Sequence, residues 1–243
     1  MFKLPLSDLL FADPCLVCRK PIGESDPFPG LCRHCLSQLP WRASDCRLAW
    51  PPEVLDNLRS PRTGFLPAEI EAAFKASQII VACAYESPIR EGLLALKFSD
   101  ATEWHRLFAA LLVQSVRRQP VRYSAVLAVP LHPRRLAERG YNQAGLIAAA
   151  VARQLDLPDW SGWLRRSRPT ERQSEQTIRT ARFANLSGAF SWTGPDDLRA
   201  AHVLLIDDVL TTGATLGAAA APLFFAGARV TGLVVASNHR APG

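Results

Sequence analysis

Apolar residues along this chain form short runs that are separated by longer segments with helical spacing. The runs predict strands buried on both faces of a sheet, over residues 79–85, 125–129, 203–206 and 229–236. The longer segments predict helices, over residues 68–77, 88–98, 104–117, 144–155 and 216–225. Strands that alternate with helices predict an α/β fold, in which helices flank both faces of a mainly parallel sheet.

The run at 203–206 leads into the most informative part of the sequence. Asp207 and Asp208 follow where this strand is expected to end. The next loop is made of small and hydroxylated residues, namely Thr211, Thr212, Gly213, Ala214 and Thr215. A strand, an acidic pair, a Thr/Gly loop and a helix, in this order, form the layout of a phosphate-binding turn at the carboxyl edge of an α/β sheet.

The chemistry of this turn favours a sugar phosphate. Gly213 allows a tight turn, so the backbone N–H groups of residues 211–215 can converge on one phosphate, and the threonine hydroxyls add donors. Asp207 and Asp208 would repel a phosphate, but they suit neutral hydroxyl groups or a hydrated Mg²⁺. A ribose 5-phosphate offers both kinds of group. The alternative is an ordinary surface turn followed by a capped helix.

A second loop with candidate ligand groups follows the strand at 125–129 and extends from Pro130 to Gln143. A basic loop at the carboxyl end of a neighbouring strand can lie beside the phosphate turn in the same crevice. Within it, Arg134 and Arg135 are candidates for binding a pyrophosphate through paired hydrogen bonds. Surface arginines next to a helix cap are the alternative interpretation.

Four cysteines near the amino terminus form two Cys-x-x-Cys pairs, namely Cys15, Cys18, Cys32 and Cys35. Each pair can present two thiolates to one ion, and two pairs complete a tetrahedral Zn²⁺ site. Because all four ligands are thiolates, the predicted zinc is structural, with redox or disulfide chemistry as the alternative. We therefore expect a small zinc-binding module at 1–41, a proline-rich linker or cover at 42–77, and the α/β domain at 78–243.

Composition and charge add two constraints. With 48% hydrophobic and 21% charged residues, no run long enough for a membrane helix and no recognisable signal peptide, the chain is expected to be cytoplasmic, without membrane insertion. The formal net charge is +6, and residues 163–190 hold six arginines against two glutamates. Such a segment suits a polyanion, either pyrophosphate or nucleic acid, or it is a solvated basic loop.

Residues 203–215 resemble, at every position, the 5-phosphoribosyl-1-pyrophosphate (PRPP) signature of type I phosphoribosyltransferases. Further motifs resemble the ComF/GntX family, in which an amino-terminal zinc finger is fused to a phosphoribosyltransferase domain. They are the two Cys-x-x-Cys pairs, Ala95-Leu-Lys-Phe98, Arg139-Gly-Tyr-Asn-Gln143, Arg168-Pro-Thr-Glu-Arg-Gln173 and Arg182-x-x-Asn185. The resemblance covers residues 12–236. Many relatives carry further Cys-x-x-Cys pairs after Trp41, whereas this chain has only Cys46 there.

The resemblance implies a role for each candidate residue. Asp207 and Asp208 would face the ribose 2- and 3-hydroxyls with Mg²⁺, and residues 211–215 would hold the 5-phosphate. Residues 163–190 correspond to a mobile loop whose arginines, including Arg168, would screen the pyrophosphate. Lys97 would approach the pyrophosphate side.

Two functions are compatible with these features. The first is an enzyme that breaks the C1–O bond of PRPP and transfers the ribosyl 5-phosphate to an acceptor. Positioning, a metal and cations around the leaving group suffice for this reaction, so no nucleophilic residue is required. The second is a non-catalytic module that binds PRPP, a nucleotide or DNA. The resemblance further implies natural competence, with single-stranded DNA or DNA-uptake proteins as partners. No motif identifies the acceptor or the oligomeric state.

Overall fold

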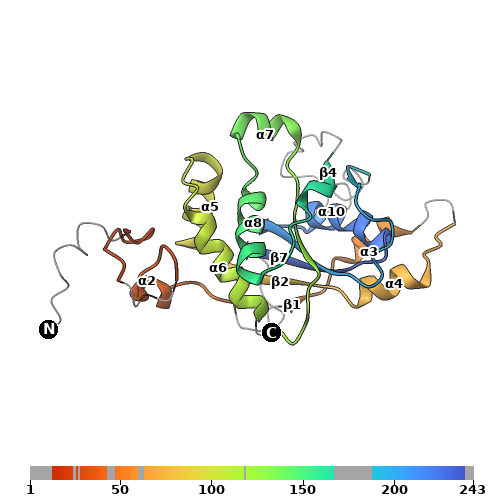
Figure 1. Ribbon diagram of the computed structural model, residues 1–243, viewed down its shortest axis with the longest axis horizontal. Coiled ribbons are helices and arrows are strands. Elements are labelled where there is room, and N and C mark those ends of the chain that lie inside the picture. The colour runs from red at the N-terminus through yellow and green to blue at the C-terminus, as the bar shows by residue number, and fades with distance from the viewer. Residues whose placement is uncertain are drawn as a thin grey trace.

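A computed structural model of the chain describes residues 13–23, 26, 28–42, 47–59, 63–117, 119–166 and 188–238. Within these residues, five strands form one sheet in the order β1-β2-β7-β6-β3 (Figure 1). They are β1 (Arg47–Leu48), β2 (Gln78–Ala84), β3 (Ala125–Ala128), β6 (His202–Leu210) and β7 (Arg229–Ser237). β1 is antiparallel to β2 and all other neighbours are parallel, so the predicted mainly parallel sheet is confirmed.

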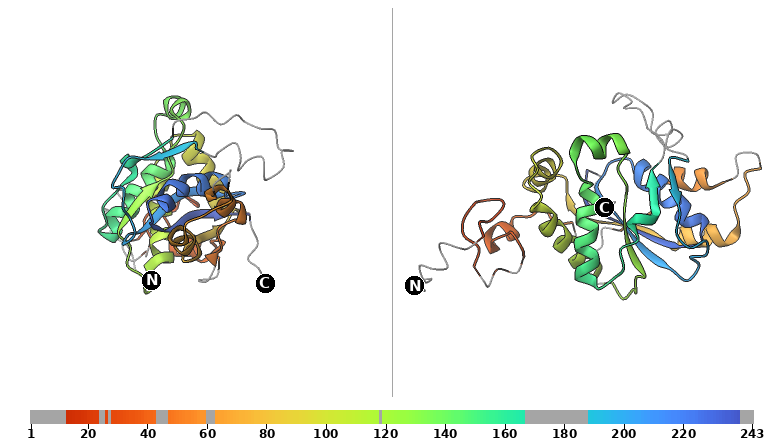
Figure 2. Two further views of the ribbon diagram at one scale, coloured as in Figure 1. Left: turned by 90° about the vertical axis from the view of Figure 1, so that its right-hand side faces the viewer. Right: turned by 45° about the horizontal axis from the view of Figure 1, so that its top comes forward.

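Helices cover both faces of the sheet, as the sequence predicts (Figure 2). One layer contains α5 (Ile89–Phe98), α6 (Trp104–Arg117) and α8 (Gln143–Leu155). The other contains α3 (Pro52–Leu58), α4 (Ala68–Lys75) and α10 (Ala214–Phe225). Successive residues of β3 pack against the two helical layers alternately. Val126 packs with the first layer, and Ala125 and Leu127 pack with the second.

The proline-rich segment 42–77 contributes to the second layer. The sequence predicts a linker or irregular cover before residue 68, whereas the structure places β1 and α3 there. The reason is that apolar residues in this segment are buried against α10. The Phe224 ring lies 5.7 Å from Trp50, just before α3, and 5.4 Å from Phe74 in α4. Although α10 is strongly apolar, neither it nor another helix in the described part of the chain is long and apolar enough to cross a membrane.

The loop predicted at 130–143 contains a short helix, α7 (Pro133–Arg139). Hydrophobic periodicity does not reveal this helix, because none of its residues is buried. Its bounds are nevertheless set by local signals. His132 caps the start by accepting the N–H of Arg134 at 3.3 Å, and Gly140, at φ 80°, ends the helix in the left-handed conformation. α8 then begins at Gln143, one residue before the predicted start of this helix.

A separate antiparallel ribbon joins β4 (Leu164–Arg166) to β5 (Phe190–Trp192), after a 3-10 turn at Ser161–Trp163. Three tryptophans stabilise it, with ring centroids 5.4, 6.3 and 5.7 Å apart: Trp160, Trp163 and Trp192. Residues 167–187, which contain Arg168 and most of the expected mobile loop, lie outside the described residues.

The cysteine-rich module, which contains α2 (Arg33–Ser37), lies at one end of the molecule (Figure 1). Backbone hydrogen bonds join its last residues to the outer edge of β2. The N–H of Arg42 donates to the Ala82 carbonyl at 3.0 Å, and the N–H of Ala84 donates to the Pro40 carbonyl at 2.8 Å. Residues 40–42 and β1 therefore cover successive parts of the same strand edge.

Candidate functional site

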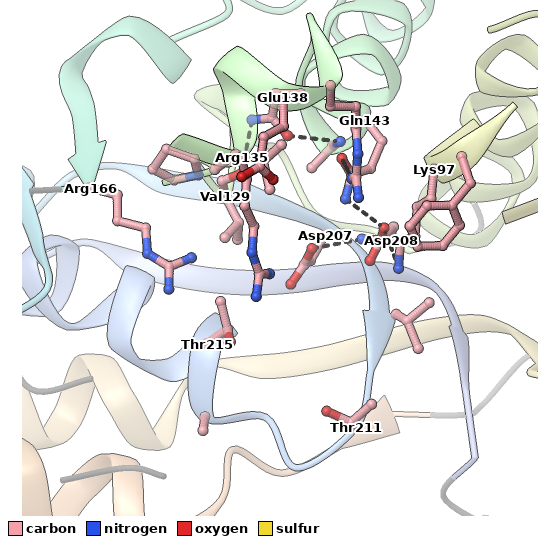
Figure 3. Close-up of a pocket in the computed structure, with 18 of the residues that line it drawn as sticks. Lys97, Val129, Arg135, Glu138, Gln143, Arg166, Asp207, Asp208, Thr211 and Thr215 are labelled. Atoms are coloured by element: carbon pink, nitrogen blue, oxygen red, sulfur yellow. Dashed lines mark hydrogen bonds and ion pairs between the residues drawn. The ribbon is translucent and has the colours of Figure 1, made fainter. Parts of the chain in front are cut away.

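A cavity of about 880 Å³ opens at the carboxyl ends of β3 and β6 (Figure 3). It is bounded by the last residues of α5, by the first residues of α8 and α10, by α7 and by β4. This is the crevice in which open α/β sheets bind ligands. It brings together most of the predicted site residues. Those in its lining are Lys97, Arg135, Asp207, Asp208, Thr211, Thr212, Ala214 and Thr215.

The acidic pair lies within β6 and not after it. The sequence predicts that the strand ends at Ile206, but pairing with β7 continues to Leu210. β3 is shorter, and its last residue, Ala128, pairs with Ile206. Asp207 and Asp208 therefore extend beyond the end of β3 and line the cavity there. Asp208 faces α5 and α8, since Lys97 and Gln143 contact its carboxylate. Figure 3 shows Asp207 on the side of Arg135 and Arg166.

Asp208 is 5% exposed and already has charged and polar partners. The Lys97 ammonium lies 2.8 Å from Asp208 Oδ2, and Gln143 Nε2 donates to the same oxygen at 3.0 Å. Gln143 is itself buried, and its Oε1 accepts a hydrogen bond from Arg139 at 2.5 Å. Two helices and the end of α7 thus hold this carboxylate in one position.

Asp207 is less well neutralised. Its Oδ1 accepts the backbone N–H of Asp208 at 2.9 Å. Burial and the neighbouring Asp208 carboxylate raise the pKa of Asp207 to about 7, against the opposing effect of Lys97 and Arg166. A carboxylate pair that Lys97 neutralises only in part, and that offers only oxygen donors, fits a hard divalent cation such as Mg²⁺.

The threonine turn follows β6 and starts α10. Gly213 has φ 80°, and a Cβ added there would lie 2.8 Å from Pro51 Cγ, so this position requires glycine. Thr212 Oγ1 accepts the N–H of Ala214 at 3.3 Å. Thr211, Thr212, Ala214 and Thr215 line the cavity, whereas Gly213 shapes the turn without lining it.

Two arginines approach the cavity from the α10 side of the acidic pair. Figure 3 shows the guanidinium groups of Arg135, from α7, and Arg166, from β4, directed toward Asp207 and Thr215. Arg166 lies over the Phe190 ring at 5.2 Å, and burial together with Arg135 lowers its pKa. Arg134 is exposed on α7 and does not line the cavity.

No individual site role was predicted for Phe98, Arg139 or Gln143, and Arg166 was predicted only as one of the arginines of residues 163–190 that would screen the pyrophosphate; all four line the cavity. A signal for Gln143 was present, since it follows a helix-capping asparagine. Asn142 Oδ1 accepts the N–H of Ala144 at 3.1 Å, and its Nδ2 donates to the Val129 carbonyl at 3.0 Å. That cap fixes the first residue of α8 against the end of β3.

The four amino-terminal cysteines form a second candidate site. Their Sγ atoms all lie within 4.8 Å of one another, and Cys18 and Cys32 are 3.7 Å apart. Four sulfurs around one Zn²⁺ would be separated by about 3.8 Å, so the cluster fits a tetrahedral ion. Burial opposes ionisation of Cys15, but backbone N–H groups, including those of Cys18 and Cys32, lower its pKa to about 6. None of these four cysteines is in a disulfide, and His34 is exposed on α2.

Comparison with known proteins gives close relatives in sequence. No family model matches the chain. It is 29% identical to competence protein F of Haemophilus influenzae over 208 residues, which cover 83% of this chain and 80% of that protein. It is 30% identical to DNA utilization protein YhgH of Salmonella typhimurium over 210 residues, which cover 83% of this chain and 86% of that protein. Among solved structures, adenine phosphoribosyltransferase of Leishmania tarentolae is 16% identical, with 64% of this chain and 74% of that chain covered. Its TM-score of 0.38 is a loose likeness.

Proposed function

The chain belongs to the ComF family, and on that premise we propose that it binds PRPP together with Mg²⁺ in the cavity at the end of β6. Its similarity to a competence protein and to a DNA utilization protein extends over most of the chain, which confirms the resemblance found in the sequence. Membership supports a role in competence or DNA utilisation. The residues that line the cavity support the proposed ligand.

One observation carries this proposal: a single cavity joins the acidic pair, the threonine turn and several cationic side chains. PRPP needs all three. Its 5-phosphate suits the backbone and hydroxyl donors of 211–215 at the start of α10. Its ribose hydroxyls suit the carboxylates of Asp207 and Asp208. Its pyrophosphate suits Arg135 and Arg166, whose planar groups can donate paired hydrogen bonds.

In the transfer reaction, these residues would orient the PRPP molecule and stabilise the transition state, and none of them would form a covalent bond to it. As the C1–O bond breaks, positive charge develops on the ribose and negative charge on the departing pyrophosphate. The carboxylates would stabilise the positive charge on the ribose, and the arginines would stabilise the negative charge on the pyrophosphate. Mg²⁺, which Asp207 and Asp208 would hold, supplies further neutralisation of the pyrophosphate when bound. The walls of the cavity would fix the distance between ribose and acceptor.

The alternative is a protein that binds the same ligand without turnover, and one observation favours it. Lys97 forms an ion pair with Asp208, so an ammonium group already neutralises one of the two carboxylates. In this case the protein would handle single-stranded DNA or DNA-uptake proteins, and the ligand would regulate it. A screen for pyrophosphate release over candidate acceptors separates the two functions.

We propose structural zinc for the four cysteines, in a chain that works in the cytoplasm. Among the residues that the structure describes, the cluster consists of four cysteine sulfurs with no His, Asp or Glu ligand beside them, and four thiolates would leave no open position for catalysis. A reducing compartment keeps such thiols available to a metal. The zinc would support the module, in which few of the described residues are buried.

Isothermal titration calorimetry of the full chain with PRPP, with and without Mg²⁺, tests the proposed function. We expect saturable binding at one site that strengthens when Mg²⁺ is present, and weaker binding of ribose 5-phosphate and of pyrophosphate, each of which carries part of the ligand. Absence of heat with PRPP at millimolar concentration, from protein with a native circular dichroism spectrum, contradicts the proposal.

A further inference from the structure

An aromatic ring stands exposed at the rim of the cavity, next to an arginine. Phe98, the last residue of α5, lines the cavity and is 73% exposed. The guanidinium carbon of Arg139 lies 5.5 Å from the centre of its ring. An exposed aromatic face beside a guanidinium group is a flat, partly cationic surface on which planar heteroaromatic groups stack.

This surface is connected to the acidic pair by hydrogen bonds. Arg139 donates to Gln143, and Gln143 donates to Asp208. α5 and α8 belong to one helical layer, whereas the threonine turn starts α10 in the other. The acidic pair at the sheet edge therefore lies between the turn and Phe98. A ligand whose phosphate occupies the turn, and whose hydroxyls meet the acidic pair, has its far end near this ring.

The charges beside Phe98 are of both signs. Lys97 and Arg139 are cationic, whereas Asp100, two residues after Phe98, is acidic and lines the same cavity. The Asp100 carboxylate can accept hydrogen bonds from the ring N–H and amino groups of a base, which a phosphate does not offer. The arginines that suit pyrophosphate, Arg135 and Arg166, are directed toward Asp207 instead (Figure 3).

We propose that Phe98 and Arg139 form a stacking site for the planar base of a nucleotide or of an acceptor, adjacent to the ribose position. This inference rests on the proposed function, because residues 211–215 and the acidic pair must hold the sugar phosphate for the base to reach Phe98. It assigns the cavity to ligands that carry a heteroaromatic ring, and it makes Phe98 the residue that selects them.

Two probes separate the base from the sugar phosphate: AMP carries a base, and ribose 5-phosphate does not. Stacking on one aromatic side chain strengthens binding by roughly tenfold, so we expect the full chain to bind AMP about tenfold more tightly than ribose 5-phosphate. Phe98→Ala should remove this preference and leave the affinity for ribose 5-phosphate unchanged, whereas Phe98→Trp should keep the preference. Leu94→Ala is the matched control, since Leu94 is exposed on the same helix but does not line the cavity.

The outcomes distinguish this inference from the proposed function. Equal affinity of the wild type for AMP and ribose 5-phosphate overturns the inference and leaves the proposed function standing. Equal weakening of both ligands in Phe98→Ala also overturns it, because Phe98 would then support the site without contacting a base. A wild-type chain that binds neither ribose 5-phosphate nor PRPP overturns the proposed function, and this inference with it.

Discussion

The Lys97 ammonium lies 2.8 Å from Asp208 Oδ2, so one half of the acidic pair carries its own cation. Lys97→Met should destabilise the metal-free protein by about 1–3 kcal/mol, because a buried carboxylate loses its charged partner. Mg²⁺ should then stabilise the variant more than the wild type, since it replaces the missing charge. Thermal unfolding with and without Mg²⁺ measures both effects.

The matched control for this variant is Lys75→Met. Lys75 forms an ion pair with Glu71 at 2.8 Å, but both side chains are largely outside the core, so its loss should have little effect. The same Mg²⁺-dependent shift in wild type and Lys97→Met would mean that Lys97 does not compete with the metal.

The acidic pair should be required for PRPP binding and dispensable for folding. Asp207→Asn combined with Asp208→Asn should weaken PRPP binding in the presence of Mg²⁺ roughly tenfold to a hundredfold, because charged hydrogen bonds to the ligand are lost. Calorimetric titration checks this, with Asp197→Asn as the control, since Asp197 is exposed and pairs with Arg199. Wild-type affinity in the double variant would exclude these carboxylates from the site.

Gly213→Val should abolish phosphate binding for a different reason. Its side chain would collide with Pro51 and occupy a left-handed backbone position, so the turn could not keep its shape. Gly64→Ala separates the two causes, because Gly64 also has positive φ but nothing lies within 4 Å of an added Cβ. We expect Gly64→Ala to retain PRPP binding; loss of binding in both variants would point to general instability.

The two neighbouring arginines of α7 should differ in their effects. Arg135→Ala should weaken binding of PRPP and pyrophosphate roughly tenfold, because Arg135 lines the cavity. Arg134→Ala should leave both affinities unchanged, because Arg134 is exposed and does not line the cavity. If single-stranded DNA competes for the same cationic groups, its affinity should fall steeply with salt. Equal effects of the two substitutions on pyrophosphate binding would contradict this placement of the arginines.

Replacing Cys32 by Ser should release zinc and unfold the amino-terminal module selectively. Metal binding and local folding are coupled in a segment this small, so hydrogen exchange should rise in residues 13–42 more than in the main sheet. Elemental analysis gives the zinc content. Cys83→Ala is the control: Cys83 is buried in β2, outside the cysteine cluster, and its loss should leave zinc bound. Protein purified under reducing conditions without zinc would refute the metal site.

His202 should make the protein less stable in acid. Burial, with Arg229 nearby, lowers the pKa of His202 from 6.5 to about 4, and its Nε2 lies 2.8 Å from Thr231 Oγ1. Between these pKa values the unfolded chain binds a proton that the folded chain does not. The stabilisation is therefore complete above pH 6.5 and is lost as the pH falls toward 4. Urea unfolding at pH 7.5 and 4.5 should show that wild type loses about 2–3 kcal/mol more than His202→Gln. Equal losses would contradict the neutral, buried histidine.

The sequence predicts the parts of this fold that depend on apolar runs and on strong local motifs. The strands and helices around β3, α8 and β6 follow from such runs, and the threonine turn and cysteine pairs follow from residue type and spacing. The sequence does not reveal that β6 continues to Leu210, because that length depends on pairing with β7. Nor does it reveal α7, whose side chains are not buried.

The sequence predicts which residues belong to the site better than it predicts which of them contact one another. Lys97 is expected near pyrophosphate, yet it pairs with Asp208, from which it is separated by more than a hundred residues. Gln143 reaches the same oxygen only because α8 packs beside β6. Such contacts depend on how helices cross the sheet, and no local pattern encodes that crossing.

Both edges of the main sheet are closed by irregular parts of the chain. Along β2, residues 40–42 supply the hydrogen bonds, and along β3, Val126 bonds with Pro158 and Trp160. Unpaired strand edges recruit strands from other molecules. A shortened chain that starts at residue 47 would keep β1, α3, α4 and every residue of the cavity but uncover residues 82–84 of β2, and it should aggregate. The cysteine-rich module would therefore keep this strand edge from pairing with other molecules.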